Sequence, residues 1–373
     1  MLRLFTVTIV VLAAVVAVLG AALVAVRTVR TVRRRKLAAL AAGPRRALLN
    51  FVADNGHDGG HDLVAIPDHA WRAVEPAALS LLGKLRGEAH LALVSVFLRR
   101  GAARTALGAL HSRSPVRRAR AAQLLGDLEL RQAVPELCRL LTDRHEEVRV
   151  VAVRALGRIG DPAAAWRLIA SLDRPDPVPS LLATQALAQL GPDAELTLSA
   201  ALDHPQARVR AVCLNALGQL GAAGAVQRVA RVLREDTVLD VRIAAAATLG
   251  KLGTRSALDP LTRALIPARP TPLRAAAARA LGELGSPAAV PALAALLDDD
   301  AYRVAHEAAQ ALRRLGPKGL AALREVVERE KRMAGESGAG AHARPSPARA
   351  HAQEALALGA VSGVAPSGDL VAV

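Results

Sequence analysis

One short pattern recurs along the chain at a nearly constant period, and this repeat limits what the chain can fold into. The pattern is VRAVCLNALGQLG over residues 209–221. Seven copies align on a central leucine, with successive leucines 30 to 32 residues apart: Leu125, Leu156, Leu187, Leu217, Leu249, Leu281 and Leu312. A unit of this length cannot bury its apolar face alone, so the period predicts stacked units that share one continuous core.

The composition indicates that the stacked units are helical. Apolar residues make up 52% of the chain and aromatic residues only 2%, so Ala, Leu and Val must build the core. The two cysteines, Cys138 and Cys213, fit neither a disulfide framework nor a zinc-ligand spacing. We predict an all-α fold in which both cysteines are small buried side chains.

Positions within the repeat separate into packing positions and helix ends. The residues four and one before the central leucine are mostly small, which lets neighbouring helices approach closely. In six copies a glycine that would end the helix in a left-handed conformation follows four residues after the leucine: Gly160, Gly191, Gly221, Gly253, Gly285 and Gly316. Four of these glycines are followed by a proline that would start the next helix: Pro162, Pro192, Pro287 and Pro317. Each repeat is therefore predicted to be a pair of helices.

Acidic turns and regularly placed arginines join the repeats. The second helix ends at an acidic residue in five copies: Asp143, Asp173, Asp203, Asp236 and Asp298. The first helix carries an arginine seven residues before the central leucine in five copies: Arg118, Arg149, Arg210, Arg242 and Arg274. With the VR, ALG and LG elements, residues 114–331 resemble the short HEAT-like repeats of bacterial proteins, including the bilin lyase-type branch. The resemblance implies a right-handed α-solenoid with an Asp/Arg ladder between repeats, which Ser180 and Ala305 interrupt.

Two rows of polar residues lie two before and two after the central leucine, so they share one face of the first helix. The resemblance implies that this helix lines the concave side of the solenoid, where such proteins hold partners. A merely solvated helix face is the alternative. The predicted partner-binding residues are Gln123, Arg154, Arg158, Gln185, Gln189, Asn215, Gln219, Lys251, Arg279, Glu283, Gln310 and Arg314.

An uncharged, apolar run at residues 4–26 is the candidate membrane anchor. As a helix it would be roughly 35 Å long, and a hydrocarbon core is about 30 Å thick. Six basic residues follow it: Arg27, Arg30, Arg33, Arg34, Arg35 and Lys36. Because positive charge stays on the cytoplasmic side, we expect a single-pass protein of the cell membrane with a cytoplasmic repeat body. The alternative is a cleaved signal peptide.

The net positive charge is concentrated near the amino terminus. Residues 1–46 contribute +9 of the net charge of +16, and residues 47–331 contribute +7. The basic juxtamembrane segment, residues 27–46, is expected to fix the topology, with binding of anionic lipid headgroups as a second role. The few aromatic residues are dispersed, so stacking on nucleic-acid bases is not favoured.

The segments that flank the array are less regular. Residues 47–113 are predicted to be a helical linker and a divergent amino-terminal repeat. Their loop at residues 54–62 carries His57 and His61 beside acidic residues, but a Gly-Gly pair separates the histidines, so a polar surface turn is favoured over a metal site. No cofactor or metal is expected. Residues 332–373, rich in Gly, Ala, Ser and Pro, are predicted to be disordered.

The sequence contains no phosphate loop, nucleophile elbow or HExxH motif. We therefore expect a non-enzymatic, membrane-anchored scaffold or adaptor that binds a protein partner. The layout is similar to bacterial membrane-anchored HEAT-repeat proteins, some of which accompany membrane glycosyltransferases, and this implies an accessory role in polysaccharide synthesis. The alternatives are a HEAT-like repeat enzyme of the bilin lyase type and a basic helical-repeat DNA-binding protein.

Overall fold

The computed structural model describes residues 27–28, 42–57, 60–336 and 346–361. Over these residues all regular secondary structure is helical, which confirms the all-α prediction for them. The chain divides between His111 and Ser112 into two compact units.

The first unit is a small helical cluster. It contains a helix over residues 42–53, α2 (His61–Ala65), α3 (Asp68–Leu82), α4 (Gly87–Arg99) and α5 (Ala102–Ala109). Trp71 and Phe97 meet edge to face in its core, with ring centroids 5.5 Å apart. The Arg100 guanidinium lies 4.5 Å from the Trp71 ring centroid and donates hydrogen bonds to carbonyl oxygens at the C-terminal end of α2. This arginine therefore ties α2 to the end of α4.

The predicted membrane location is overturned. Within the described ranges, no helix combines the length and the apolar character that crossing a bilayer requires. The longest helix there, α19 (Pro317–Glu336), has 20 residues and carries charged side chains along its length. The expectation of a single-pass protein of the cell membrane with a cytoplasmic repeat body is therefore wrong. The apolar run at residues 4–26 lies outside the described residues, as do Arg30, Arg33, Arg34, Arg35 and Lys36, whereas Arg27 is described and exposed.

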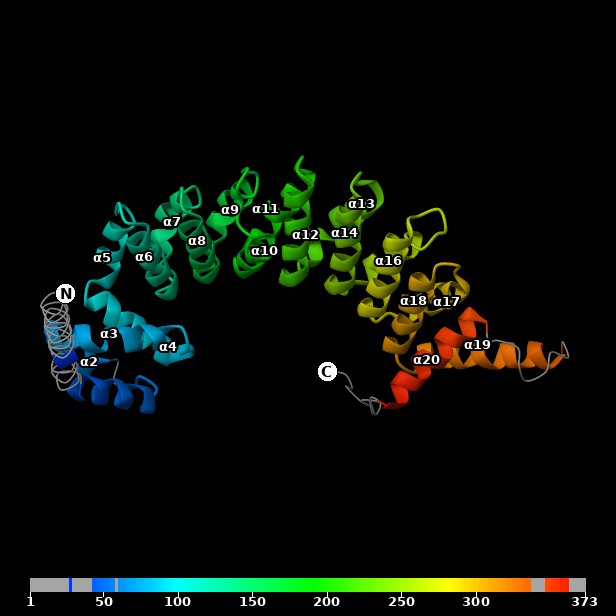
Figure 1. The fold of residues 1–373 in the computed structure, drawn as a ribbon, viewed down its shortest axis with the longest axis horizontal. Coiled ribbons are helices and arrows are strands. Elements are labelled where there is room, and N and C mark those ends of the chain that lie inside the picture. The colour runs from blue at the N-terminus through cyan, green and yellow to red at the C-terminus, as the bar shows by residue number, and fades with distance from the viewer. Residues whose placement is uncertain (1–26, 29–41, 58–59, 337–345, 362–373) are drawn as a thin grey trace, which may run out of the picture. The chain divides into compact units, whose positions relative to one another are not determined.

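The second unit stacks the repeats as pairs of helices in two layers (Figure 1). The first helices of the repeats are α6 (Pro115–Asp127), α8 (Glu146–Ile159), α10 (Ser180–Gln189), α12 (Ala207–Leu220), α14 (Leu239–Leu252), α16 (Thr271–Leu284) and α18 (Tyr302–Arg314). Each packs against the first helix of the next repeat. In Figure 1 they line the inner side of this unit's curve.

The outer layer holds the second helices: α7 (Val134–Leu140), α9 (Ala165–Ser171), α11 (Glu195–Ala200), α13 (Val226–Glu235), α15 (Leu258–Arg263), α17 (Val290–Ala295) and α19. Short 3-10 turns precede six of them: η1 (Arg131–Ala133), η2 (Pro162–Ala164), η3 (Pro192–Ala194), η5 (Ala223–Ala225), η6 (Arg255–Ala257) and η7 (Pro287–Ala289). Two more, η4 (Ala201–Asp203) and η8 (Leu296–Asp298), follow α11 and α17.

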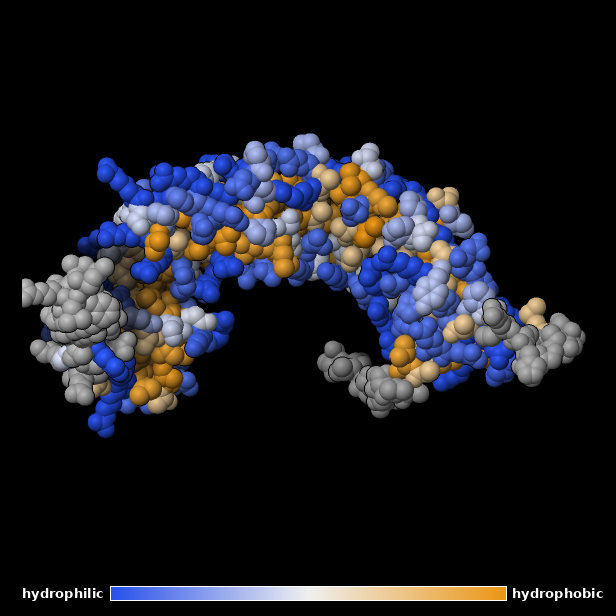
Figure 2. All heavy atoms as spheres, viewed as in Figure 1, coloured by the Kyte–Doolittle hydropathy of each residue, from blue (hydrophilic) through white to orange (hydrophobic). Residues whose placement is uncertain are grey.

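The repeat chemistry predicted from the sequence is confirmed at its main positions. All seven central leucines are fully buried, with 0% exposure. The six helix-ending glycines have φ between 64° and 82°, a region that favours glycine. Prolines begin η2, η3, η7 and α19, as expected at the first position of a helix. Figure 2 shows the result as a band of apolar residues along the middle of the repeat stack, bordered by hydrophilic residues.

A second glycine row sets the closeness of the stack. In five copies the residue directly after the central leucine is a glycine, and it faces the residue just before the next central leucine. A Cβ built on Gly126 would lie 2.7 Å from the Cα of Ala155, and one on Gly282 would lie 2.8 Å from the Cα of Ala311. These distances are well inside van der Waals contact, so the first helices touch backbone to backbone at these junctions.

The Asp/Arg ladder forms in part. Arg118 pairs with Asp143 and Arg210 with Asp236, each at 2.7 Å and largely buried. The guanidinium in each pair also donates to backbone carbonyls in the turn before its own helix. Each ladder arginine therefore connects two successive turns.

The other two Asp/Arg pairs of the ladder differ from the prediction in their acidic partner. Arg149 pairs with Asp176 at 2.5 Å rather than with Asp173, and Arg274 pairs with Asp299 rather than with Asp298. The acceptor thus lies one to three residues later in the turn than its sequence register suggested.

Two junctions have no rung of this kind. Ser180 stands in the arginine position of the third repeat, and Asp203 is bound instead by Arg231 of the outer layer at 2.7 Å. The turn that follows Arg242, residues 264–270, contains no acidic residue, and the buried Nε of Arg242 has no hydrogen-bond partner.

The tail also differs from its prediction. Instead of being disordered throughout residues 332–373, the chain forms α20 (Pro347–Val361), which packs against α18 and α19. The alanines at Ala348, Ala352 and Ala355 are fully buried on one face of this helix. Their spacing of four and three residues is a helical stripe, and it accounts for the packing.

Candidate partner-binding groove

All twelve predicted partner-binding residues lie on first helices, and none is buried. Asn215, Arg279 and Gln310 are half-buried, and the other nine are exposed. The first helices present these positions because the central leucine of each helix points into the core, while residues two positions away on either side point out of it.

Six positions of the two polar rows meet in one concave site. The α6–α10 groove is a cavity of about 370 Å³ across α6, α8 and α10. Its polar lining consists of Gln123, Asp127, Arg154, Arg158, Gln185 and Gln189. Gly126, Ala155 and Ala186 also line it, so its floor is built from the same small residues that bring the helices together.

Two of the three charged side chains in the groove form an ion pair, and the third does not. Asp127 is 7% exposed and forms an ion pair with Arg158. The Arg154 guanidinium is exposed, and no hydrogen bond or ion pair satisfies it within the described part of the chain. The side-chain oxygen of Gln189 lies over Gly157, 2.6 Å from where a Cβ would stand. The groove therefore offers one unpaired positive charge among amide groups that both donate and accept hydrogen bonds.

The other predicted residues continue the face without lining this groove. Asn215 and Gln219 belong to α12, Lys251 to α14, Arg279 and Glu283 to α16, and Gln310 and Arg314 to α18. Gln310 accepts a hydrogen bond from the Nε of Arg313, so its amide is already engaged in part.

A second cavity of about 380 Å³ lies in the outer layer, between α13 and α15. Four arginines line it: Arg231, Arg234, Arg263 and Arg269. Arg231, Arg234 and Arg263 pair with acidic residues, so much of this charge is compensated. Two of its arginines, Arg231 and Arg263, share one register, each 14 residues after the central leucine of its repeat, but the alignment of the first helices did not include them.

Two of the ladder carboxylates, Asp143 and Asp236, have lowered pKa values. Burial alone would raise the pKa of Asp143, but hydrogen bonds from Arg118 and from the backbone N–H of His145 outweigh it and lower that pKa. The pKa of Asp236 is lowered in the same way: burial is outweighed by hydrogen bonds from Arg210 and the Val238 N–H. These groups stay ionised at neutral pH and support the scaffold.

The two cysteines are poor nucleophiles. Burial raises the pKa of Cys138 to about 11 and that of Cys213 to about 12. A thiol with such a pKa carries almost no thiolate near pH 7, so neither side chain is suited to covalent catalysis.

Within the described ranges, the potential metal ligands that come together are His306, His351 and Glu354, between α18 and α20. His57 and His61 belong to no such group there. The sequence could not suggest the cluster of His306, His351 and Glu354, because its two histidines lie 45 residues apart.

The comparisons with known proteins agree with this repeat architecture. HEAT repeats match residues 103–188, 194–270 and 264–334. A search of curated proteins found no match.

Solved structures that are similar to this chain include the complex of CpcE and CpcF of phycocyanin lyase from Nostoc sp. PCC7120. That similarity is 25% in identity, covers 60% of this chain and 92% of that one, and has a TM-score of 0.32. Human deoxyhypusine hydroxylase in complex with glycerol is 22% identical, with 80% and 92% covered and a TM-score of 0.28. The karyopherin Kap121p bound to the SUMO protease Ulp1p is 14% identical, with 79% and 38% covered and a TM-score of 0.47.

These TM-scores are all below 0.5, so the three structures carry no argument about function. The repeat match is different in kind, because its ranges cover more than half of the chain and coincide with the helix pairs of the stack. The chain belongs to the HEAT-repeat family.

Proposed function

We propose that this chain is a non-catalytic HEAT-repeat scaffold that binds a protein partner in the α6–α10 groove. One observation carries the proposal: polar side chains from three successive repeats, in rows recognised from the sequence, line a single cavity of about 370 Å³. A face that was merely solvated would not need to be hollowed at the same positions.

The groove lining favours an extended peptide segment that carries an acidic side chain. The Gln123, Gln185 and Gln189 amides can pair with the N–H and C=O groups of a peptide backbone. The unpaired Arg154 guanidinium suits a carboxylate, because its parallel N–H groups match the two carboxylate oxygens. Since Arg158 is already paired with Asp127, Arg154 is the proposed anchor for the acidic group.

The narrower role in polysaccharide synthesis is not part of this proposal. That role depended on a membrane location, and the described helices do not support one. The lyase and DNA-binding alternatives stay predictions.

Site-specific photo-crosslinking in cells tests the proposal. A photoreactive residue at Gln185, inside the groove, is compared with one at Leu196, which is 83% exposed on α11 in the outer layer. We expect a discrete protein adduct from position 185 and none from position 196.

A charge reversal then identifies the anchor. Arg154→Glu should abolish the adduct from position 185, whereas Arg255→Glu on the outer-layer turn η6 should leave it unchanged. Adducts of equal yield from both crosslinking positions, or an adduct insensitive to Arg154→Glu, would overturn the assignment of the groove.

A further inference from the structure

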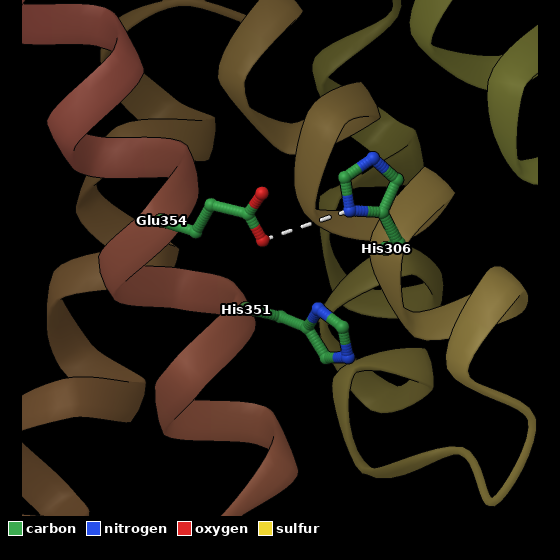
Figure 3. A group of neighbouring side chains, drawn as sticks. All are labelled: His306, His351 and Glu354. Carbon is green, nitrogen blue, oxygen red and sulfur yellow. Dashed lines mark ion pairs between the residues drawn. The ribbon is translucent and has the colours of Figure 1, made fainter.

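Three potential metal ligands converge between α18, which is the first helix of the last repeat, and α20, the helix of the tail. His306 comes from α18, and His351 and Glu354 come from α20, three residues apart and so on one face of that helix. The candidate ligand atoms all lie within 4.8 Å of one another. Figure 3 shows the three side chains pointing toward one another across the space between the two helices.

One ring nitrogen of this histidine cluster is buried without a hydrogen-bond partner. His351 is only 5% exposed. The Nδ1 atom of His306 is buried and has no hydrogen-bond partner, and its nearest charged neighbour is the Glu354 carboxylate at 3.7 Å. Buried ring nitrogens in folded proteins are normally satisfied, so this arrangement leaves room for a further bonding group.

Tyr302 packs against both imidazoles. Its ring stacks on the His306 ring at 14° with a centroid distance of 5.8 Å, and it lies 4.8 Å from the His351 ring. This packing restricts the imidazoles before any ligand binds, which lowers the ordering cost of binding.

The cluster contains a carboxylate, which suits a cation. Glu354, which is half exposed, supplies the negative charge.

We propose that His306, His351 and Glu354 bind a divalent transition-metal ion of the Zn²⁺ type, which fastens α20 to α18. Two imidazole nitrogens and one carboxylate oxygen are a usual protein ligand set for zinc, with a fourth position open to water. Zinc bonds to such ligands are about 2.0–2.2 Å long, which places tetrahedral ligands roughly 3.4 Å apart. The 3.7 Å between His306 and Glu354 is close to that value, and the candidate atom of His351 lies within 4.8 Å of both.

Zinc titration of the tag-free full-length chain tests the site. Calorimetry is expected to show one Zn²⁺ per chain at micromolar zinc, and His306→Ala and His351→Leu should each abolish this binding. Leucine at 351 keeps the buried position apolar, so the helix packing is preserved. Glu354→Gln should weaken zinc binding by about tenfold or more, since one of three ligands is lost.

Two control variants belong to the same experiment. Glu307→Gln removes a carboxylate next to His306 that is not part of the cluster, and His61→Ala removes a histidine of the first unit. Both should bind zinc like the unaltered chain. If His61→Ala loses the zinc, the ion binds in the first unit and the proposal is wrong.

Hydrogen exchange supplies a readout that does not depend on any variant. Zinc should slow amide exchange in α20, and a chelator should reverse the effect. The proposal fails if the unaltered chain binds no zinc, if binding survives both histidine variants, or if zinc leaves exchange in α20 unchanged.

Discussion

Replacing Gly282 by alanine probes how closely the first helices pack. A Cβ on Gly282 would lie 2.8 Å from both the Cα and the Cβ of Ala311, and a backbone atom cannot move away as a flexible side chain can. Overpacking of this kind costs roughly 1–3 kcal/mol. The substitution also gains helix propensity, worth about 0.5–1 kcal/mol, so we expect a net destabilisation of up to about 2.5 kcal/mol, with a central value of about 1 kcal/mol.

Gly218 is the matched control for this substitution. It occupies the same position of its repeat, directly after the central leucine, yet an added Cβ would meet nothing closer than 3.4 Å, and that atom is the Cδ of Lys251. Gly218→Ala should therefore be neutral or stabilising by up to about 1 kcal/mol.

Urea unfolding followed by circular dichroism measures both variants against the unaltered chain. The midpoint should fall for Gly282→Ala and stay or rise for Gly218→Ala, with the slope of each transition checked because repeat arrays can unfold in parts. Equal midpoints for the two variants would refute the reasoning, since their difference depends only on the distance to the next helix.

Three further outcomes follow from the ladder and the cysteines. Arg210→Ala should destabilise the chain by about 3 kcal/mol because it leaves Asp236 buried and unpaired, whereas Arg242→Ala, which breaks no ion pair, should cost clearly less in the same urea assay. Because the folded pKa of Asp236 is lowered, its contribution to stability is complete above its unfolded pKa of about 4 and is lost as pH falls through the folded value. Asp236→Asn should therefore weaken the loss of unfolding free energy that the unaltered chain shows as pH falls below about 4. An unchanged loss in this variant would contradict the pairing. Cys138 and Cys213, with pKa values of about 11 and 12, should react with iodoacetamide at pH 7.5 far more slowly in the folded chain than in urea, as mass spectrometry of the alkylated protein can measure.

Features that repeat could be predicted from the sequence, because alignment of the copies separates buried from exposed positions. The central leucines, the helix-ending glycines and the exposure of the two polar rows all follow from this periodicity. The convergence of Gln123, Arg154 and Gln185 on one groove follows as well, since equivalent residues of stacked helices must be neighbours.

Features that depend on irregular segments could not be predicted. The ladder acceptors Asp176 and Asp299 were missed because turn length differs between repeats, and register across a turn is set by its conformation. The histidine cluster needs α20 folded back on α18, a contact between residues far apart in the sequence. The tail composition suggested disorder because its Gly and Pro residues obscured one helical stripe of alanines. The membrane prediction rested on an apolar run that belongs to no described helix.

The ladder determines which part of the stack resists bending. Ion pairs connect Arg118 to Asp143 and Arg149 to Asp176, so both junctions between α6, α8 and α10 are reinforced. The junctions after Ser180 and Arg242 have no such rung. Bending of the second unit is therefore expected to concentrate at those two junctions, while the three helices that line the groove keep their spacing. A partner would meet a groove of constant width whatever the curvature of the rest of the stack, and binding would cost little reorganisation.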